Sequence, residues 1–254
     1  MIKVKEIYNY LNKIAPFETS MSFDNTGLLV GNMEDVVENV VVTLDITKEV
    51  IDEATKCNAN LIISHHPVIF EGIKNIEFNS VVAMLIKNNI NAIAVHTNLD
   101  IADLGVNYHL AKSLDLENVE LVEKVEKCIS KGTLSKPMTE VEFATKVKEK
   151  LNCKGVRFTN INKMISTVLV ACGAGGDAVY DASKYKADAL VTGEIKHHQI
   201  LFAVENGVAV FDAGHYKSED VVINPLVNML ENEFKEVKFI KSKRFTDTID
   251  YIWF

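Results

Sequence analysis

Two neighbouring histidines, His65 and His66, are the first residues of this chain whose type and spacing suit metal chemistry. They follow the apolar run 61–64 and precede Pro67, which biases His66 toward an extended backbone. At the end of a strand, two adjacent imidazoles can diverge around a common point and give one nitrogen to each of two metal ions. The alternative is a pair of surface or hydrogen-bonded core histidines. Their position directly after a buried strand favours ligands.

A second candidate pair is His215 and Glu219, which are four residues apart. On a helix this spacing puts both side chains on one face, and Gly214 allows a sharp turn into that helix. The alternative is an exposed helix start in which Glu219 interacts favourably with the helix dipole.

Asp100 follows the apolar run 92–96 and supplies a carboxylate, whose two oxygens can bridge two cations as an imidazole cannot. Its alternative role is to cap the next helix. His96 could be a ligand or a donor that orients a ligand, and we favour the orienting role because ligating groups usually need such a partner.

Two glycine-containing turns also follow expected strands. The run 173–177 lacks the spacing of a nucleotide-binding loop, so we interpret it as a tight turn, with phosphate contact as the minor alternative. After Gly193, either Glu194 or His198 is expected to line a crevice, and His197 is expected to face solvent.

The elements that would position these residues alternate between short apolar strands and amphipathic helices, which predicts an α/β fold with largely parallel sheets. The strands are expected at 40–45, 61–64, 92–96, 166–172, 189–192 and 208–212. The helices are expected at 47–57, 80–88, 105–114, 140–151, 177–185 and 196–205, the fourth opening with a capping box at Thr139. Because ligands in open α/β sheets bind beyond the carboxyl ends of strands, we expect the polar residues to converge there.

The charged run at 123–132, followed by Pro137, indicates a boundary between two lobes around 122–137. We expect a first lobe of 1–127 plus 208–254 and a second lobe of 128–207. The stretches 238–245 and 248–254 are expected to be two strands that return to the first lobe.

The formal net charge of -8, from 27 Lys and Arg against 35 Asp and Glu, argues against a nucleic-acid backbone as the main partner. No stretch is apolar enough to span a membrane and the N-terminus lacks the apolar core of a signal peptide, so we expect a cytoplasmic protein. The cysteines form no C-x-x-C pair and are expected in the core: Cys57, Cys128, Cys153 and Cys172.

Together these motifs resemble the Nif-three-like family, whose members are called GTP cyclohydrolase type 2 homologues. The resemblance spans nearly the whole chain in order. It rests on the runs Ser22–Gly31, Thr43–Asp45, Ser64–Pro67, His96–Asp100, Thr192–Glu194 with His198, and Gly214–Glu219. Many members have Trp where this chain has Phe23, and Asp where it has Glu194.

The resemblance implies a dinuclear site for divalent cations such as iron, zinc or manganese, in which the two carboxylates bridge the ions. Its ligands would be His65, His66, Asp100, His215 and Glu219. His96, Glu194 and His198 would be neighbours of the site, and His109 and His197 would lie outside it. The resemblance also implies two intertwined three-layer α/β/α lobes, the first carrying most of the ligands, with no extra domain inserted between them, and a ring-shaped homohexamer.

The implied activity is metal-dependent hydrolysis of a nucleotide, an anionic small molecule that such a pocket would attract. Metal-bound hydroxide would attack C8 of the purine of GTP, and ring opening would release formate. The alternative is a non-catalytic metal-binding or regulatory scaffold built on the hexamer. Nucleic-acid binding by the ring, for example around Lys241, Lys243 and Arg244, is a weaker option that the acidic charge disfavours.

Overall fold

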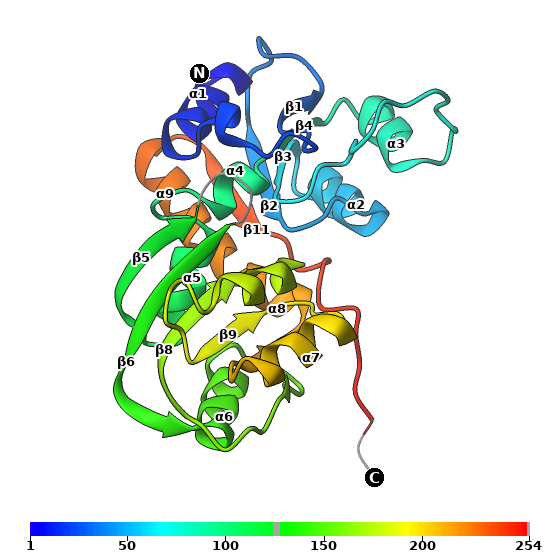
Figure 1. Cartoon of the computed structure of the whole chain (residues 1–254). Coiled ribbons are helices and arrows are strands. Elements are labelled where there is room, and N and C mark those ends of the chain that lie inside the picture. Colours follow the sequence, from blue (N-terminus) through cyan, green and yellow to red (C-terminus); the bar gives the residue numbers. More distant parts are fainter. Residues whose placement is uncertain (124–127, 253–254) are drawn as a thin grey trace. The chain divides into compact units, whose positions relative to one another are not determined.

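The computed structural model describes residues 1–123 and 128–252 and divides into two compact units (Figure 1). Unit 1 comprises Met1–Ala102 and Ile223–Thr246, and unit 2 comprises Asp103–Val222 with the stretch that begins at Asp247. Each unit thus combines two stretches of chain. Their bounds differ from the expected lobes, which assigned 103–127, 208–222 and the stretch that begins at Asp247 to the first lobe. Residues 209–212 form a strand of the unit 2 sheet, which explains the second difference.

Unit 1 is built on a five-stranded sheet in the order β1-β4-β3-β2-β11. Strands β2, β3, β4 and β11 are parallel, and β1 is antiparallel to β4. The parallel arrangement places the carboxyl ends of β3 and β4 next to each other. The strands are β1 (Gly27–Val30), β2 (Asn39–Thr43), β3 (Ala59–Ser64), β4 (Asn91–Ala94) and β11 (Lys238–Lys241).

Helices cover both faces of the unit 1 sheet, and its central strands are therefore apolar on both sides. Val41 of β2 packs in a buried cluster with Ile51 and Leu85 from the helices α2 and α3. Successive strand residues point to opposite faces, so Val40 faces the other side, where α9 contacts β2 and Tyr10 of α1 meets Phe234 edge to face. The helices are α1 (Val4–Ile14), α2 (Lys48–Lys56), α3 (Val81–Lys87), α4 (Thr97–Asp100) and α9 (Ile223–Glu233), with a 3-10 turn at Phe17–Thr19.

Unit 2 is built on a six-stranded sheet in the order β5-β6-β8-β9-β10-β7. Its centre, β8-β9-β10, is parallel, while β5, β6 and β7 are added antiparallel at the edges. The carboxyl ends of β9 and β10 are therefore neighbours. The strands are β5 (Glu117–Glu123), β6 (Ile129–Thr139), β7 (Arg157–Phe158), β8 (Met164–Ala171), β9 (Ala189–Thr192) and β10 (Ala209–Asp212).

The unit 2 sheet is also covered on both faces. Leu190 of β9 packs in a buried cluster with Val179 and Ala203, which come from the 3-10 segment η2 and from α7. On the other face Phe143 of α6 meets Phe211 of β10 edge to face at 4.8 Å between ring centroids. The helical elements are α5 (Val106–Ser113), α6 (Glu140–Lys150), η2 (Gly175–Asp181), α7 (His197–Glu205), α8 (His215–Glu219) and η3 (Asp220–Val222).

The expected α/β fold with largely parallel and mixed sheets is confirmed, with three differences. The helix expected at 177–185 is instead the end of the 3-10 segment η2, which stops at Asp181, followed by turns. No unit boundary lies in the described part of 122–137, because its residues belong to the paired strands β5 and β6 of unit 2; residues 124–127 lie outside the described part. Of the two C-terminal strands, β11 pairs with β2, but residues 248–252 form no strand, and 253–254 lie outside the described part.

The cysteines are less uniformly buried than expected. Cys153 and Cys172 are buried, whereas Cys57 and Cys128 are partly exposed. Cys57 is partly exposed because it caps the C-terminus of α2 rather than packing in a sheet. Within residues 1–123 and 128–252, no helix combines the length and the apolar character needed to cross a membrane.

The capping box expected at the start of α6 is present and gives a test of this local structure. The Thr139 hydroxyl accepts from the Glu142 amide at 3.3 Å, and the Glu142 carboxylate accepts from the Thr139 amide at 2.8 Å. We predict that Thr139→Ala lowers the local stability of α6 by about 1 kcal/mol. Amide hydrogen exchange in the first turn of α6 measures this loss. Thr139→Ser keeps the hydroxyl and should restore the protection; equal protection in the Ala variant would contradict the role of the cap.

Candidate metal centre

His65 and His66 directly follow β3 and continue its pairing with the chain after β2. The His65 amide donates to the Thr43 carbonyl at 3.1 Å, and the His66 amide donates to the Leu44 carbonyl at 2.9 Å. The Ser64 hydroxyl donates to the His66 carbonyl at 2.7 Å and holds the turn. The two imidazole rings lie 4.9 Å apart, so the sheet itself brings these histidines together.

His96 joins this pair because β4 runs parallel to β3 and ends beside it. The rings of His65 and His66 lie 5.1 and 5.3 Å from the His96 ring. One ring nitrogen from each of the three histidines lies within 4.8 Å of the others, a spacing that suits a shared metal ion. His96 was expected to orient a ligand, and this geometry also suits it to be a ligand.

Each of these three histidines has an acceptor at Nδ1. The acceptor is the Val95 carbonyl for His65, the Asp45 carboxylate for His66 and the Asp24 carboxylate for His96, each at 2.9 Å. Because a carbonyl and a carboxylate can only accept, Nδ1 carries the proton, and in a neutral imidazole the lone pair is then on Nε2. An acceptor that fixes the tautomer in this way is typical of metal-binding histidines.

Asp24 is held as a carboxylate by its surroundings. Burial alone would raise its pKa, but hydrogen bonds from His96 and Thr97 lower the pKa of Asp24 to about 2. The Thr97 amide and hydroxyl both donate to its Oδ2, at 3.0 and 2.5 Å. Sequence reasoning missed Asp24 and Asp45 as orienting groups, although both lie inside motif runs; their partners are 72 and 21 residues away in the chain.

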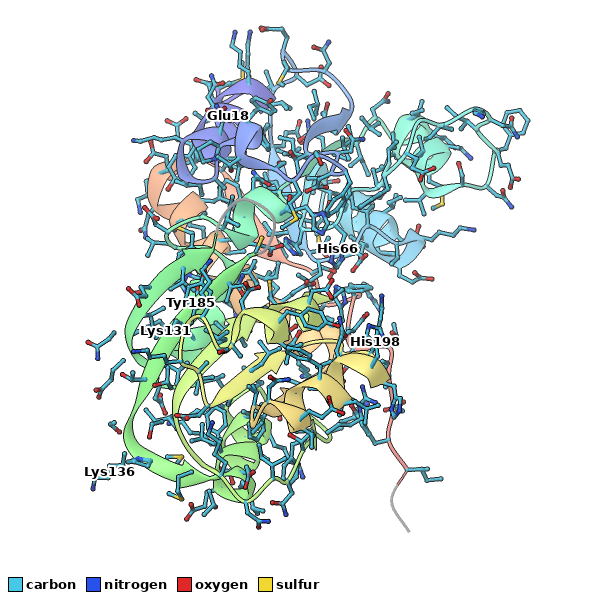
Figure 2. All side chains as sticks on the ribbon, viewed as in Figure 1. Glu18, His66, Lys131, Lys136, Tyr185 and His198 are labelled. Carbon is cyan, nitrogen blue, oxygen red and sulfur yellow. The ribbon has the colours of Figure 1, made fainter. Side chains whose placement is uncertain are left out.

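Asp100 is the carboxylate that the sequence expected in this set. It is the last residue of α4 and only 8% exposed, and its Oδ1 lies 3.5 Å from His65 Nε2. The alternative role as a cap of the next helix is not observed, because Gly105 caps α5. His65, His66 and Asp100 therefore lie together in unit 1. Figure 2 shows the position of His66.

Unit 2 brings His215 and Glu219 together on α8, as their spacing predicted. Gly214 precedes the helix with a φ of 86°, a conformation that favours glycine. His215 Nδ1 donates to Glu194 Oε1 at 2.7 Å, so the His215 lone pair is also on Nε2 when the ring is neutral. That Nε2 lies 3.2 Å from Oε1 of Glu219, which is 3% exposed.

The glycine turn after β8 packs against this pair. A Cβ atom on Gly173 would lie 2.1 Å from Glu219 Oε1 and 3.2 Å from His215 Nε2, and its φ is +54°. The Gly173 amide donates to the Ser218 hydroxyl at 2.9 Å. The turn therefore leaves space for the His215 and Glu219 side chains, which agrees with the tight-turn interpretation.

The remaining histidines differ in surroundings. His197 and His198 are exposed at the start of α7, where Figure 2 labels His198. His109 is half-buried on α5, and burial lowers its pKa.

The donor atoms in both units fit a divalent cation. In each unit an imidazole held through Nδ1 directs Nε2 at a carboxylate oxygen, at 3.5 Å for His65 and Asp100 and at 3.2 Å for His215 and Glu219. When the ring is neutral, both facing atoms are acceptors, and a cation between them satisfies both. Mixed imidazole and carboxylate ligands suit several divalent ions, including zinc, iron and manganese.

Residues 2–248 match the profile of Duf34/NIF3 (NGG1p interacting factor 3). The chain belongs to the DUF34/NIF3 family. This confirms the resemblance drawn from the motifs.

Relatives of this DUF34/NIF3 chain match it over nearly its full length. A Clostridium perfringens protein named "GTP cyclohydrolase 1 type 2 homolog" is 32% identical over 262 residues, covering 99% of this chain and 100% of that protein. The crystal structure of a hypothetical protein from Staphylococcus aureus has a TM-score of 0.91 at 32% identity, covering 98% and 99% of the two chains. A Bacillus cereus protein related to NIF3 has a TM-score of 0.93 at 24% identity, covering 99% of each chain, which supports the fold.

The close approach at Gly173 gives a test of the unit 2 pair. We predict that Gly173→Ala destabilises the protein, because the new methyl group would displace the Glu219 carboxylate. Gly207→Ala is the matched control, since Gly207 also has a positive φ of +66° but nothing within 4 Å of a Cβ. The shared backbone strain costs about 1 to 2 kcal/mol. A greater loss of unfolding free energy in Gly173→Ala, measured by chemical denaturation, isolates the contact; equal losses would contradict it.

Proposed function

We propose that this protein binds two divalent cations and is a metal-dependent hydrolase that acts on a nucleotide, with GTP as the candidate substrate. The ligands in this proposal are His65, His66, Asp100, His215 and Glu219. The observation that supports it most is the pairing, in each unit, of an oriented imidazole with a buried carboxylate. The names of the curated relatives support the choice of GTP.

The chain's own groups would prepare these ligands before any cation binds. Asp45 and Glu194 accept the Nδ1 protons of His66 and His215, so each ring keeps one tautomer and one orientation. The Val95 carbonyl does the same for His65. Divalent cations, when bound, would lower the pKa of coordinated water and balance the charge of phosphate groups.

The acidic groups of unit 1 also favour a cation. Asp24, Asp45 and Asp100 supply three carboxylates around its three histidines. The Asp24 and Asp100 side chains are largely removed from bulk water, which is costly beside neutral imidazoles, and a bound cation would offset that cost. The ring-shaped homohexamer and the cytoplasmic location stay predictions.

Metal analysis of variants tests the binding part of the proposal. We expect about two equivalents of divalent metal in the reconstituted wild type, and less metal in both His65→Ala and His215→Ala, because each change removes one ligand nitrogen. Elemental analysis after dialysis gives the stoichiometry. His197→Ala, at an exposed histidine, is the matched control and should keep the wild-type content. Wild-type content in His65→Ala, or substoichiometric metal in the reconstituted wild type, would reject the site.

Turnover of a nucleotide panel tests the catalytic part. We expect the metal-loaded protein to release formate from GTP, and Asp100→Ala to abolish this release because a carboxylate ligand is lost. Formate is measured enzymatically and the pterin precursor by absorbance. If GTP is inert and another nucleotide is turned over, that nucleotide replaces GTP as the proposed substrate. Full metal loading with no turnover of any nucleotide would favour the non-catalytic scaffold.

A further inference from the structure

Two phenylalanines in unit 1, Phe23 and Phe70, are exposed side by side. Phe23 is 59% exposed and Phe70 is 46% exposed. Their rings are nearly parallel, with centroids 6.2 Å apart and an angle of 24° between the planes. Aromatic side chains normally contribute buried area to a core, so a stacked pair left in solvent is a candidate binding surface.

The backbone beside Phe23 is held firmly. The next residue, Asp24, accepts hydrogen bonds from His96 and Thr97, and its amide donates to the Met21 carbonyl at 2.9 Å. The Met21 amide in turn donates to the Thr97 hydroxyl at 2.9 Å. Phe23 therefore lies on a short turn fixed to the start of α4.

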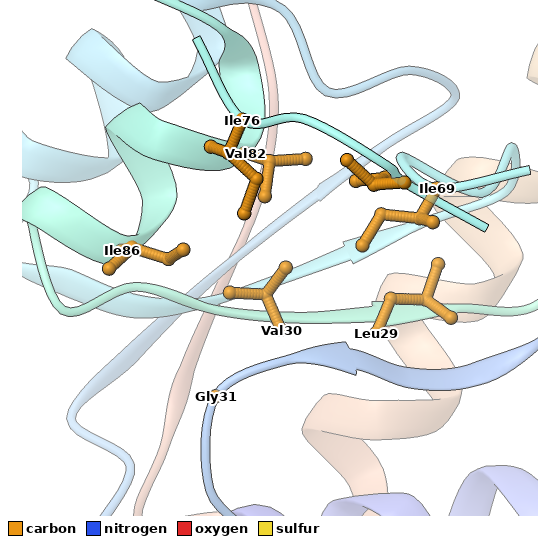
Figure 3. A pocket seen from close by; sticks show the side chains of 8 residues that line it. Leu29, Val30, Gly31, Ile69, Ile76, Val82 and Ile86 are labelled. Carbon is orange, nitrogen blue, oxygen red and sulfur yellow. The ribbon is translucent and has the colours of Figure 1, made fainter. Parts of the chain in front are cut away.

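The backbone beside Phe70 is held from two sides. The preceding residue, Ile69, lines an apolar pocket of about 400 Å³ together with Leu29 of β1 and Val82 of α3 (Figure 3). The Ile69 carbonyl accepts from the Asn25 side-chain amide at 2.6 Å. Since Asn25 follows Asp24, this hydrogen bond connects the two loops that carry the phenylalanines.

The aromatic pair borders the histidine cluster. The Phe70 ring centroid lies 6.1 Å from that of His96, with an angle of 70° between the rings. A flat ring stacked on the pair would thus lie beside the candidate metal ligands. Near-parallel aromatic faces on fixed loops suit a planar heteroaromatic ring, because stacking uses the π-face that every nucleobase has.

We propose that Phe23 and Phe70 form a stacking platform beside the histidine cluster for the base of a purine nucleotide. This proposal rests on the proposed function, because it assigns the base of that substrate to a surface. It predicts that ligands with a base bind through the two phenylalanines, and that removing either phenylalanine weakens this binding without changing the metal content.

Binding of three probes tests the platform. GTP, guanosine and inorganic triphosphate are titrated into the metal-loaded protein by calorimetry. We expect Phe23→Ala and Phe70→Ala each to weaken GTP and guanosine about tenfold or more, and to leave triphosphate within about twofold. Phe23→Trp keeps an aromatic face and should retain guanosine, whereas Phe23→Leu keeps only apolar volume and should not.

The control variant is Phe78→Ala, which removes a fully exposed phenylalanine between Pro67 and α3 and should leave all three affinities unchanged. Metal content is measured on every variant.

The platform is overturned, even if two metals are bound, when the phenylalanine variants still bind guanosine normally or when the wild type binds neither guanosine nor GTP. Phenylalanine-dependent guanosine binding without stoichiometric metal supports the platform and rejects the metal proposal. A change in oligomeric mass in Phe23→Ala with guanosine affinity unchanged assigns the pair to a subunit interface and overturns the platform.

Discussion

The hydrogen bond from a histidine Nδ1 to a fixed acceptor is the interaction on which this site depends. Among the described residues of the site, His65, His66, His96 and His215 each make it, and the acceptor residues are Val95, Asp45, Asp24 and Glu194 respectively. Each bond selects one tautomer and one ring orientation, so that Nε2 is the atom presented outward. Without these bonds the rings would rotate and exchange tautomers, and an ordered set of ligand nitrogens would carry a larger entropy cost.

The parallel sheets supply the geometry for these hydrogen bonds. Because β3 and β4 run side by side in the same direction, His65 and His96 emerge at one edge, and the Val95 carbonyl reaches the His65 ring. The turn after β2 brings Asp45 to His66, and the turn before β1 brings Asp24 to His96. In unit 2 the adjacent ends of β9 and β10 lead to Glu194 and His215 in the same way. The apolar strands stabilise the fold, and the polar residues just beyond them form the candidate metal centre.

Much of the fold followed from local patterns. Most of the expected strands and helices are present within a few residues, because periodic apolar residues reflect burial on one or two faces. Local patterns did not predict two kinds of feature. The edge strands β5 and β6 contain charged residues that hide a strand pattern, and the segment at 177–185 has helical periodicity but forms 3-10 turns. The unit bounds also differed, since β10 belongs to the sheet with which it pairs rather than to its neighbours in sequence.

The sequence by itself determined the family, the α/β class and the residue types of the candidate ligands, since these depend on residue identity and short-range spacing. It also determined that His215 and Glu219 share one helix face, because four residues make about one turn. Only the tertiary structure decided which acceptor orients each histidine and that Phe23 stacks on Phe70. Those contacts join residues that are between 21 and 72 positions apart. Such pairings arise from strand order and loop packing, and they cannot be predicted from a local pattern in the chain.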